Sequence, residues 1–339
     1  MKKRRILLLA MVCAATIASS CKKDDEDDTE YNYVSGTVEL GATMPQYVKA
    51  GDVFDFKPTG AYLDDGSIGY YWVCTPLKTQ KDTLKFESDP ADKSTKFSYK
   101  IPSDTLCNIS ITVTAYAKDC ISISSSQTST IVAAGLNTGS LRGLSLSLST
   151  PFITDPRDGK NYFYTTIGKL DWFSQNLAWE GAGKPYADSE AMTDIFGHYY
   201  SWTEAQTACP AGWRVPSDSD WREIARTYGT DPGEGFKQFD GVAADMMVDA
   251  TFNRETMWEY WPEVKISDKS GFWAIPTHYA TINNGEYSFN AAQYGLWWSS
   301  DELDGLGIAR YIFEKSNTLF ADGFDKNYVA APVRCVREH

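Results

Sequence analysis

The chain has 339 residues, of which 42% are hydrophobic, 14% aromatic and 23% charged, and its formal net charge is −13. Its length exceeds that of one typical domain and favours two. The acidic balance argues against nucleic acid and anionic lipid as partners, because both carry negative charge. Ten of the eleven tryptophans lie between Trp172 and Trp298, so the two halves should differ in kind.

The first 20 residues have the layout of a signal peptide. Four basic residues, from Lys2 to Arg5, precede an apolar run from Ile6 to Ile17 that is too short to cross a bilayer. Small residues then lead to Cys21, and this arrangement resembles the lipobox of bacterial lipoproteins. The resemblance implies cleavage before Cys21 and a lipid anchor on its sulfur, with fatty acyl chains such as palmitate. The alternative is an ordinary cleaved signal followed by an accidental cysteine.

Residues 21–30 form an acidic tether in this interpretation. The run from Asp24 to Asp28 cannot pack into a core and should stay solvated. Loss of the four basic charges with the signal would leave a mature chain of net charge about −17. The acidic run also resembles the export signal of Bacteroidetes surface lipoproteins. That resemblance implies an outer-membrane protein that faces the cell exterior and meets the membrane through its anchor alone.

Residues 31–134 have the pattern of an all-β domain. Apolar residues from Ile109 to Ala115 alternate with serine and threonine, as in a half-buried antiparallel strand. Val53–Phe56 and Gly69–Cys74 have the same character, and turn residues separate the segments. Strands about ten residues apart around one buried tryptophan, Trp72, predict an immunoglobulin-like β-sandwich. No catalytic set is visible in it, and we expect it to act as a stalk.

Five cysteines remain once Cys13 leaves with the signal and Cys21 is lipidated, so at least one should be free or buried. Cys74 and Cys107 share the parity of neighbouring core positions on their strands, so both are predicted to point inward. A disulfide between Cys74 and Cys107 is possible. Two small buried apolar residues are an equally good interpretation.

Residues 135–140 are small and polar, and we expect them to link the sandwich to a second domain over residues 141–339. Two capping patterns predict helices in this domain. Ser201, followed by Glu204 as in a capping box, begins a short one, and Ser217 begins an amphipathic one. The rest consists of short strands and long loops rich in glycine and tryptophan, so the domain is predicted to be α+β.

Three ordered blocks of this domain carry a family resemblance. They are Asp155–Tyr162 with Ile167-Gly168, Trp172 and Gln175–Leu177; Gly197–Trp202 and Cys209–Pro216 with Asp220-Trp221; and Trp297–Glu302, Ala309–Tyr311 and Val333–Glu338. Together they resemble the Fibrobacter succinogenes major paralogous domain, although Val329–Pro332 replaces that family's usual Gly-Phe-Ser type of turn. Parts of the blocks are also similar to C-type-lectin-like folds, including formylglycine-generating enzymes. The fold implied is therefore an α+β C-type-lectin-like domain.

Cys209 and Cys335 are the only cysteines of this domain, and both lie in the family blocks. We expect a disulfide between them, which would join the end of the first helix to the last strand and close a loop of about 126 residues. Chain-entropy models value such a loop at roughly 4–5 kcal/mol. Formylglycine-type enzymes need a reactive cysteine pair that binds copper. These two cysteines look structural, so neither that activity nor any cofactor is expected.

The sequence shows no catalytic motif. Its three histidines are His198, His278 and His339, and no metalloprotease, phosphate-loop or nucleophile-elbow pattern occurs. His198 lies among aromatic residues and is predicted to be a hydrogen-bonded core residue. Carboxylates between Asp301 and Asp304 could act as acid and base in glycoside hydrolysis, but solvated surface is the better interpretation. The chain is therefore not expected to be an enzyme.

Calcium is the remaining ion to weigh, because lectin-like folds often hold it with acidic and carbonyl oxygens. The usual Glu-Pro-Asn and Trp-Asn-Asp signatures are missing, and Trp298–Asp301 is a weak substitute. The metal content is left open.

Aromatic residues outside the blocks are the candidate ligand contacts. Trp258, Tyr260 and Trp261 are candidates for an exposed platform that holds sugars or peptides, with burial as the alternative. Trp298 and Asp301 are further candidates. We predict a non-catalytic cell-surface lipoprotein whose lectin-like head binds an extracellular glycan or protein, in adhesion or nutrient capture. The alternatives are a structural subunit of a surface appendage and an enzyme that acts on extracellular glycans.

Overall fold

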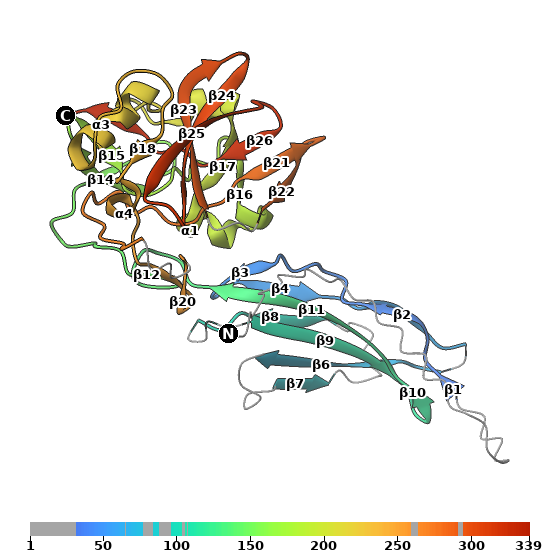
Figure 1. The fold of residues 1–339 in the computed structure, drawn as a ribbon. Coiled ribbons are helices and arrows are strands. Elements are labelled where there is room, and N and C mark those ends of the chain that lie inside the picture. The colour runs from blue at the N-terminus through green and yellow to red at the C-terminus, as the bar shows by residue number, and fades with distance from the viewer. Residues whose placement is uncertain are drawn as a thin grey trace, which may run out of the picture. The chain divides into compact units, whose positions relative to one another are not determined.

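The computed structural model describes residues 32–64, 66–76, 84–87, 96–103, 106, 108–258, 264–290 and 294–339 (Figure 1). The predicted signal peptide, Cys21 and the acidic tether lie outside the described residues. The chain forms two compact units. The first contains the residues up to Met44 and Gly51–Ile131, and the second contains Pro45–Ala50 and Val132–His339. Both are rich in strands, and no described helix is long and apolar enough to cross a membrane.

The described part of the first unit consists of strands and their connections. The strands are β1 (Asn32–Tyr33), β2 (Ser35–Glu39), β4 (Val53–Phe56), β5 (Thr59–Tyr62), β6 (Gly69–Pro76), β7 (Leu84–Glu87), β8 (Phe97–Lys100), β9 (Asn108–Tyr116), β10 (Cys120–Ile121) and β11 (Ile123–Val132). The largest sheet has the order β11-β9-β6-β7, while β2 pairs with β5, β4 with β8 and β1 with β10. The predicted alternation along β9 is confirmed, since Ile109, Ile111 and Val113 are each at most 2% exposed.

The core of the first unit forms around Trp72, which is buried as predicted. Its ring lies 5.3 Å from that of Phe56 and 4.9 Å from that of Phe97, between ring centroids. Cys74 lies two residues further along β6, on the same face, and is buried with a free thiol whose pKa burial raises to about 12. Its suggested partner Cys107 lies outside the described residues. In this structure Cys74 therefore acts as a small buried residue.

The second unit combines four sheets with short helices. Its strands are β3 (Tyr47–Lys49), β12 (Leu141–Arg142), β13 (Phe152–Thr154), β14 (Asn161–Ile167), β15 (Leu170–Phe173), β16 (Lys184–Pro185), β17 (His198–Ser201), β18 (Phe239–Asp240), β19 (Thr251–Phe252), β20 (Glu255–Thr256), β21 (Ala280–Asn283), β22 (Glu286–Phe289), β23 (Tyr294–Leu303), β24 (Leu306–Phe313), β25 (Thr318–Phe324), β26 (Val329–Ala331) and β27 (Val336–Glu338). The sheet orders are β12-β19-β20, β13-β14-β15-β27, β16-β17-β26-β21-β22 and β18-β25-β24-β23. Most neighbouring strands in these sheets are antiparallel. The long strands β23, β24 and β25 belong to one of the four sheets (Figure 1).

Both predicted helices are present, with the predicted caps. The helices of the second unit are α1 (Thr193–Phe196), α2 (Trp202–Ala208), α3 (Asp218–Tyr228) and α4 (Ala243–Met246), with 3-10 turns η1 (Tyr186–Asp188) and η2 (Glu190–Met192). Ser201 and Glu204 form a complete capping box at α2, and Ser217 forms another with Asp220 at α3. Each box satisfies backbone N–H groups that a helix start leaves without partners.

The first strands and the last strand of the family-like region lie in one sheet, of order β13-β14-β15-β27. β14 pairs with β15, and β15 pairs with β27, with Trp172 opposite Val336. The predicted disulfide is present next to this sheet and joins Cys209, at the end of α2, to Cys335 with 5.8 Å between their Cα atoms. The bond therefore locks the last strand to the first long helical segment.

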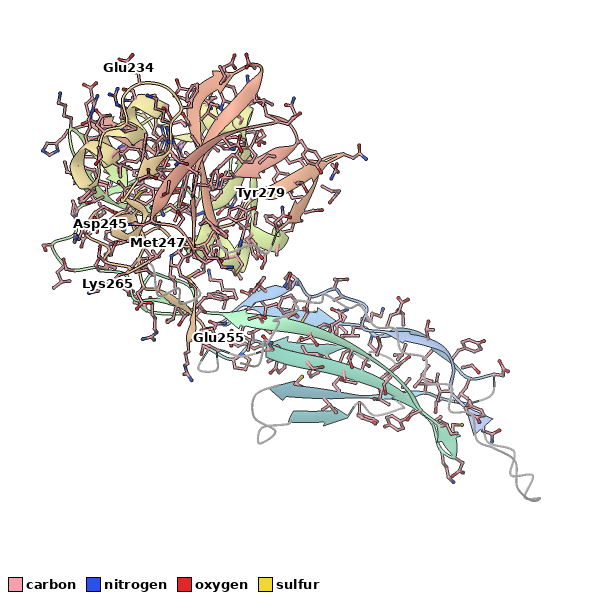
Figure 2. The ribbon with its side chains drawn as sticks, in the orientation of Figure 1. Glu234, Asp245, Met247, Glu255, Lys265 and Tyr279 are labelled. Carbon is pink, nitrogen blue, oxygen red and sulfur yellow. A yellow bond between two sulfur atoms is a disulfide. The ribbon has the colours of Figure 1, made fainter. Side chains whose placement is uncertain are left out.

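Tryptophans fill the interior of the second unit. Trp172, Trp221 and Trp297 are fully buried and belong to one apolar cluster, in which the rings of Trp172 and Trp221 lie 4.8 Å apart. Met247, labelled in Figure 2, is 1% exposed in the same cluster. Two arginines, Arg310 and Arg334, are also buried. The tryptophan-rich sequence of this half is thus explained by its core.

Candidate functional site

The predicted aromatic platform is not present at Trp258. Its side chain is only 2% exposed, and its indole Nε1 donates to the backbone oxygen of Ala274 at 3.0 Å. Trp258 packs inward because a large apolar ring that also finds a hydrogen-bond acceptor is more stable buried. The prediction that Trp258 contacts a ligand is therefore wrong. Tyr260 and Trp261 lie outside the described residues.

Trp298 and Asp301 also have structural contacts. Trp298 is fully buried, and its Nε1 donates to the backbone oxygen of Tyr200 at 2.8 Å, so its prediction as a ligand contact is wrong. Asp301 accepts hydrogen bonds at Oδ2 from the backbone N–H of Asp218 at 2.5 Å and from the hydroxyl of Ser299 at 2.9 Å. Asp218 begins α3, so the Asp301 carboxylate lies at a helix N-terminus, where negative charge is stabilising. Its role in the structure is to hold β23 against α3.

No metal site emerges around Trp298–Asp301. Across the described ranges, no group of three or more histidine, cysteine, aspartate or glutamate side chains is arranged to hold an ion. The two cysteines of this unit are joined to each other, as predicted.

The histidines are separated in the structure. His198 is 2% exposed, with Nδ1 3.3 Å from the backbone oxygen of Ala182, which confirms a hydrogen-bonded core position. Burial lowers its pKa. His278 is held among the rings of Tyr186, Phe196 and Tyr294, and burial lowers its pKa to about 4. His339 lies near the surface beside a carboxylate. These three side chains therefore form no shared acid–base site.

A polar cavity of about 280 Å³ lies on the second unit between the η1–η2 segment and the β21–β22 hairpin. It is lined by Lys184, Pro185, Asp188, Glu190, Gly285, Glu286 and Tyr287. The hairpin turn at Asn284 and Gly285 has positive φ at both residues, which suits the asparagine–glycine pair of a two-residue hairpin loop. The turn thereby places Glu286 and Tyr287 on the cavity wall.

The opposite wall of this polar cavity contains a strained turn. Ala187 and Asp188 have φ values of 56° and 49°, a left-handed conformation that side chains with a Cβ rarely adopt. Such residues cost of order 1 kcal/mol or more each and tend to occur where function requires the local shape. Here the turn leads from β16 to the two carboxylates of Asp188 and Glu190.

The charge of the polar cavity is negative, with one ammonium among three carboxylates. Burial, together with the nearby carboxylates of Glu204 and Asp188, raises the pKa of Tyr287 to about 12. The phenol therefore stays protonated and can donate a hydrogen bond at any physiological pH. The Tyr287 ring packs against Phe289, with 6.3 Å between the ring centroids. Phe289 in turn packs edge-on against the buried Tyr199.

The chemistry available in the polar cavity is that of binding. Carboxylates accept hydrogen bonds, the Lys184 ammonium donates them, and the Tyr287 ring offers an apolar wall. The Tyr287 hydroxyl is already bonded to the carboxylate of Glu204, which does not line the cavity. The lining includes no histidine, cysteine or serine that could form a nucleophile–base pair. Sequence reasoning missed this site because Asp188 and Tyr287 are almost one hundred residues apart and lie in different elements, η1 and β22.

A second candidate surface is a patch of partly buried rings, the tyrosine patch, formed by Tyr279, Tyr294, Tyr311 and Phe320. Tyr279, labelled in Figure 2, stacks on Tyr294 with 5.7 Å between centroids. Tyr311 of β24 stacks on Phe320 of β25 at 5.2 Å, as their direct pairing in the sheet allows. These rings pack against the core on one side and remain partly accessible on the other.

The comparison with known protein families finds a match in the second unit. No curated protein matches the chain. A family model described as the Fibrobacter succinogenes major domain matches residues 165–337, which is more than half of the chain. The match contains both capped helices, the Cys209–Cys335 disulfide and the polar cavity beside Tyr287. The chain belongs to the Fibrobacter succinogenes major domain family.

Proposed function

We propose that this chain is a lipid-anchored protein of the outer face of the outer membrane, and that its family domain binds an extracellular glycan without catalysis. The signal-peptide pattern ending at Cys21 and the acidic run behind it support the anchor and its location. In this proposal the first unit is an immunoglobulin-like stalk and the second a C-type-lectin-like head. The polar cavity beside Tyr287 carries the binding function.

The side chains of the polar cavity suit a sugar. A pyranose presents hydroxyls around its edge and a less polar C–H face, so it needs hydrogen-bonding groups around an aromatic wall. The hydrogen-bonding groups are those of Asp188, Glu190, Glu286 and Lys184, and the aromatic wall is the Tyr287 ring. A volume of about 280 Å³ holds one or two sugar units.

The charges of the polar cavity narrow the class of glycan. Three carboxylates against one ammonium, on a chain of net charge −13, disfavour uronic acids, sulfated sugars and other anions. Neutral sugars and amino sugars are favoured. A protein ligand with a lysine or arginine tip is the competing occupant, and the binding assay distinguishes the two.

The test is a glycan array probed with the full mature chain and two variants. Tyr287→Ala removes the aromatic wall and should weaken binding of the retained glycans by roughly tenfold or more, since a central aromatic contact commonly contributes a few kcal/mol. Tyr328→Ala is the matched control, because Tyr328 is 47% exposed and does not line the cavity. It should bind like the unaltered chain.

Other results would redirect the proposal. Loss of binding in Tyr311→Ala with normal binding in Tyr287→Ala would move the site to the tyrosine patch. An array without any retained glycan would contradict glycan binding and leave a protein ligand or a structural role in an appendage. Release of sugars from the same glycans by the unaltered chain would contradict the non-catalytic role.

A further inference from the structure

Arg334 is a fully buried cation inside the second unit, at 1% exposure. Its Nε donates to the side-chain oxygen of Asn176 at 2.7 Å, and Nη1 donates to the backbone oxygens of Phe173 at 3.1 Å and Phe272 at 2.8 Å. Nη2 donates to the backbone oxygen of Trp273 at 3.2 Å. All four acceptors are neutral. They orient the guanidinium but contribute no full negative charge.

The other buried arginine of this unit has an acidic partner, which Arg334 lacks among the described residues. Arg310 donates to the carboxylate of Asp218, whereas Arg334 forms no ion pair with any residue that the structure describes. Burial lowers the pKa of Arg334, and no acidic side chain counteracts that effect. A guanidinium nonetheless stays protonated in proteins. A buried charge without a counter-charge carries a large desolvation penalty, so a bound anion at this position would be stabilising.

A small cavity touches the same guanidinium. It has a volume of about 20 Å³, and its lining includes Arg334, Asn176, Ser174 and Trp273. A guanidinium has five N–H groups, and the four bonds above account for four of them. The fifth is on Nη2 and has no acceptor among the described residues, and the same guanidinium lines the cavity.

The size and walls of this cavity limit its occupant. A volume near 20 Å³ exceeds the roughly 10–15 Å³ needed for one water-sized particle, but it cannot hold a sulfate, a phosphate or a carboxylic acid. Leu144, Ile195 and other aliphatic side chains form most of the remaining wall. These aliphatic walls supply few hydrogen-bond partners to any occupant, so the feature that favours an anion over a water molecule is the full positive charge of Arg334.

We propose that this cavity is a structural anion site that binds a single halide ion, chloride under natural conditions, with Arg334 as its counter-charge. The hydroxyl of Ser174 is available as a second donor. Because all four acceptors of Arg334 belong to the segments 173–176 and 272–273, the ion would also stabilise the contact between the end of β15 and the loop that precedes β21. The site is independent of the polar cavity beside Tyr287.

The first test is thermal unfolding of the full mature chain in sodium chloride and in sodium gluconate of equal concentration. Gluconate is too large for the cavity, so it controls for ionic strength. Chloride should raise the midpoint of the second unit in a saturable manner over the millimolar range, as expected for a ligand of the folded state. Ser174→Val, which narrows the cavity and leaves Arg334 in place, should abolish this difference. Equal midpoints in the two salts would overturn the proposal.

The second test does not depend on a variant that folds. Crystals of the unaltered chain grown or soaked in sodium bromide should show an anomalous scattering peak in the cavity next to Nη2 of Arg334. A peak there at bromide concentrations matching the thermal response supports the site. A cavity that contains only a water molecule, with no anomalous signal, contradicts it.

Discussion

Arg310 of β24 and Asp218, the first residue of α3, form an ion pair inside the second unit. The Arg310 side chain is fully buried and that of Asp218 is 12% exposed, and Nε of Arg310 lies 2.8 Å from Oδ1 of Asp218. The guanidinium also lies 3.9 Å above the ring of Phe239 and donates to the backbone oxygen of Lys237. Three segments distant in sequence are thus held by one side chain.

Breaking this pair should be costly. Arg310→Met leaves the Asp218 carboxylate buried beside Asp301 without its cation, and loss of one partner of a buried pair typically costs about 3–5 kcal/mol. Urea unfolding of the full chain measures the effect. Lys326→Met is the control, because its partner Glu302 is 57% exposed and such surface pairs contribute about 0–1 kcal/mol. Similar losses in the two variants would contradict a dominant role for the buried pair.

Removal of the Cys209–Cys335 disulfide should destabilise the second unit alone. The bond spans 126 residues, and the chain-entropy model values a loop of that size at roughly 4–5 kcal/mol. Differential scanning calorimetry of a chain with both cysteines changed to alanine should show one lowered transition and one unchanged, because the two units have separate cores. Cys120→Ser, which removes a free thiol, should leave both transitions in place. Alkylation of both Cys209 and Cys335 in the native protein would refute the bond.

Asp268 should make the protein less stable as the pH rises. Its Oδ1 is buried without a hydrogen-bond partner among the described residues, and burial raises its pKa to about 6, against the ordinary 3.8. The folded state therefore favours the protonated form. The stability that this preference provides is complete below pH 4 and is lost as the pH rises past 6. Asp268→Asn keeps an uncharged group, and asparagine tolerates the φ of 49° at this position. The variant should melt higher than the unaltered chain at pH 8, and by a clearly smaller margin at pH 4.5. Asp322→Asn, at an exposed position, should change neither value.

His278 should act in the opposite direction. Burial lowers its pKa from 6.5 to about 4, so the folded state binds its proton less readily than the unfolded chain. The stability that follows is complete above pH 6.5 and declines as the pH falls toward 4, by up to about 3 kcal/mol. His278→Asn removes the titrating group and fits the φ of 60°. In this variant, the denaturant concentrations at the unfolding midpoint should differ less between pH 7 and pH 4.5 than they do in the unaltered chain. An unchanged difference would show that His278 is not responsible for acid sensitivity.

The lipid anchor is tested at Cys21. Cys21→Ala removes the only sulfur that the lipobox pattern offers for a thioether, so the variant should remain a precursor or leave the membrane. Fractionation of cells and mass spectrometry of the N-terminal peptide measure this. Unchanged recovery with the outer membrane would contradict the anchor.

The local patterns of the sequence predicted both capped helices and several strands correctly. A capping box depends on two residues three positions apart, so Ser201 with Glu204 and Ser217 with Asp220 could be recognised without knowledge of the fold. The alternation in β9 is equally local. The disulfide could be predicted because one unit holds two cysteines in recognised blocks.

The burial of single aromatic residues could not be predicted in this way. Whether Trp258 and Trp298 face solvent depends on the segments that cover them, and their N–H partners, Ala274 and Tyr200, lie 16 and 98 residues away. The polar cavity likewise needs the distant segments 184–190 and 285–287 to converge, and the contacts of Arg334 need the segments 173–176 and 272–273. Nor does the sequence indicate that Pro45–Ala50 packs with the second unit, where Tyr47 contacts Tyr186 and Phe252.

The adjacency of β14, β15 and β27 has a consequence for how this domain can be rearranged. Since the chain enters and leaves at one sheet, its two ends could be joined by a short peptide and new ends opened elsewhere, at the exposed Leu303–Leu306 turn for example. Circular permutation is tolerated where termini are close and the new break falls in an exposed turn. The same geometry lets such a domain be inserted into a loop of a host protein without pulling that loop apart.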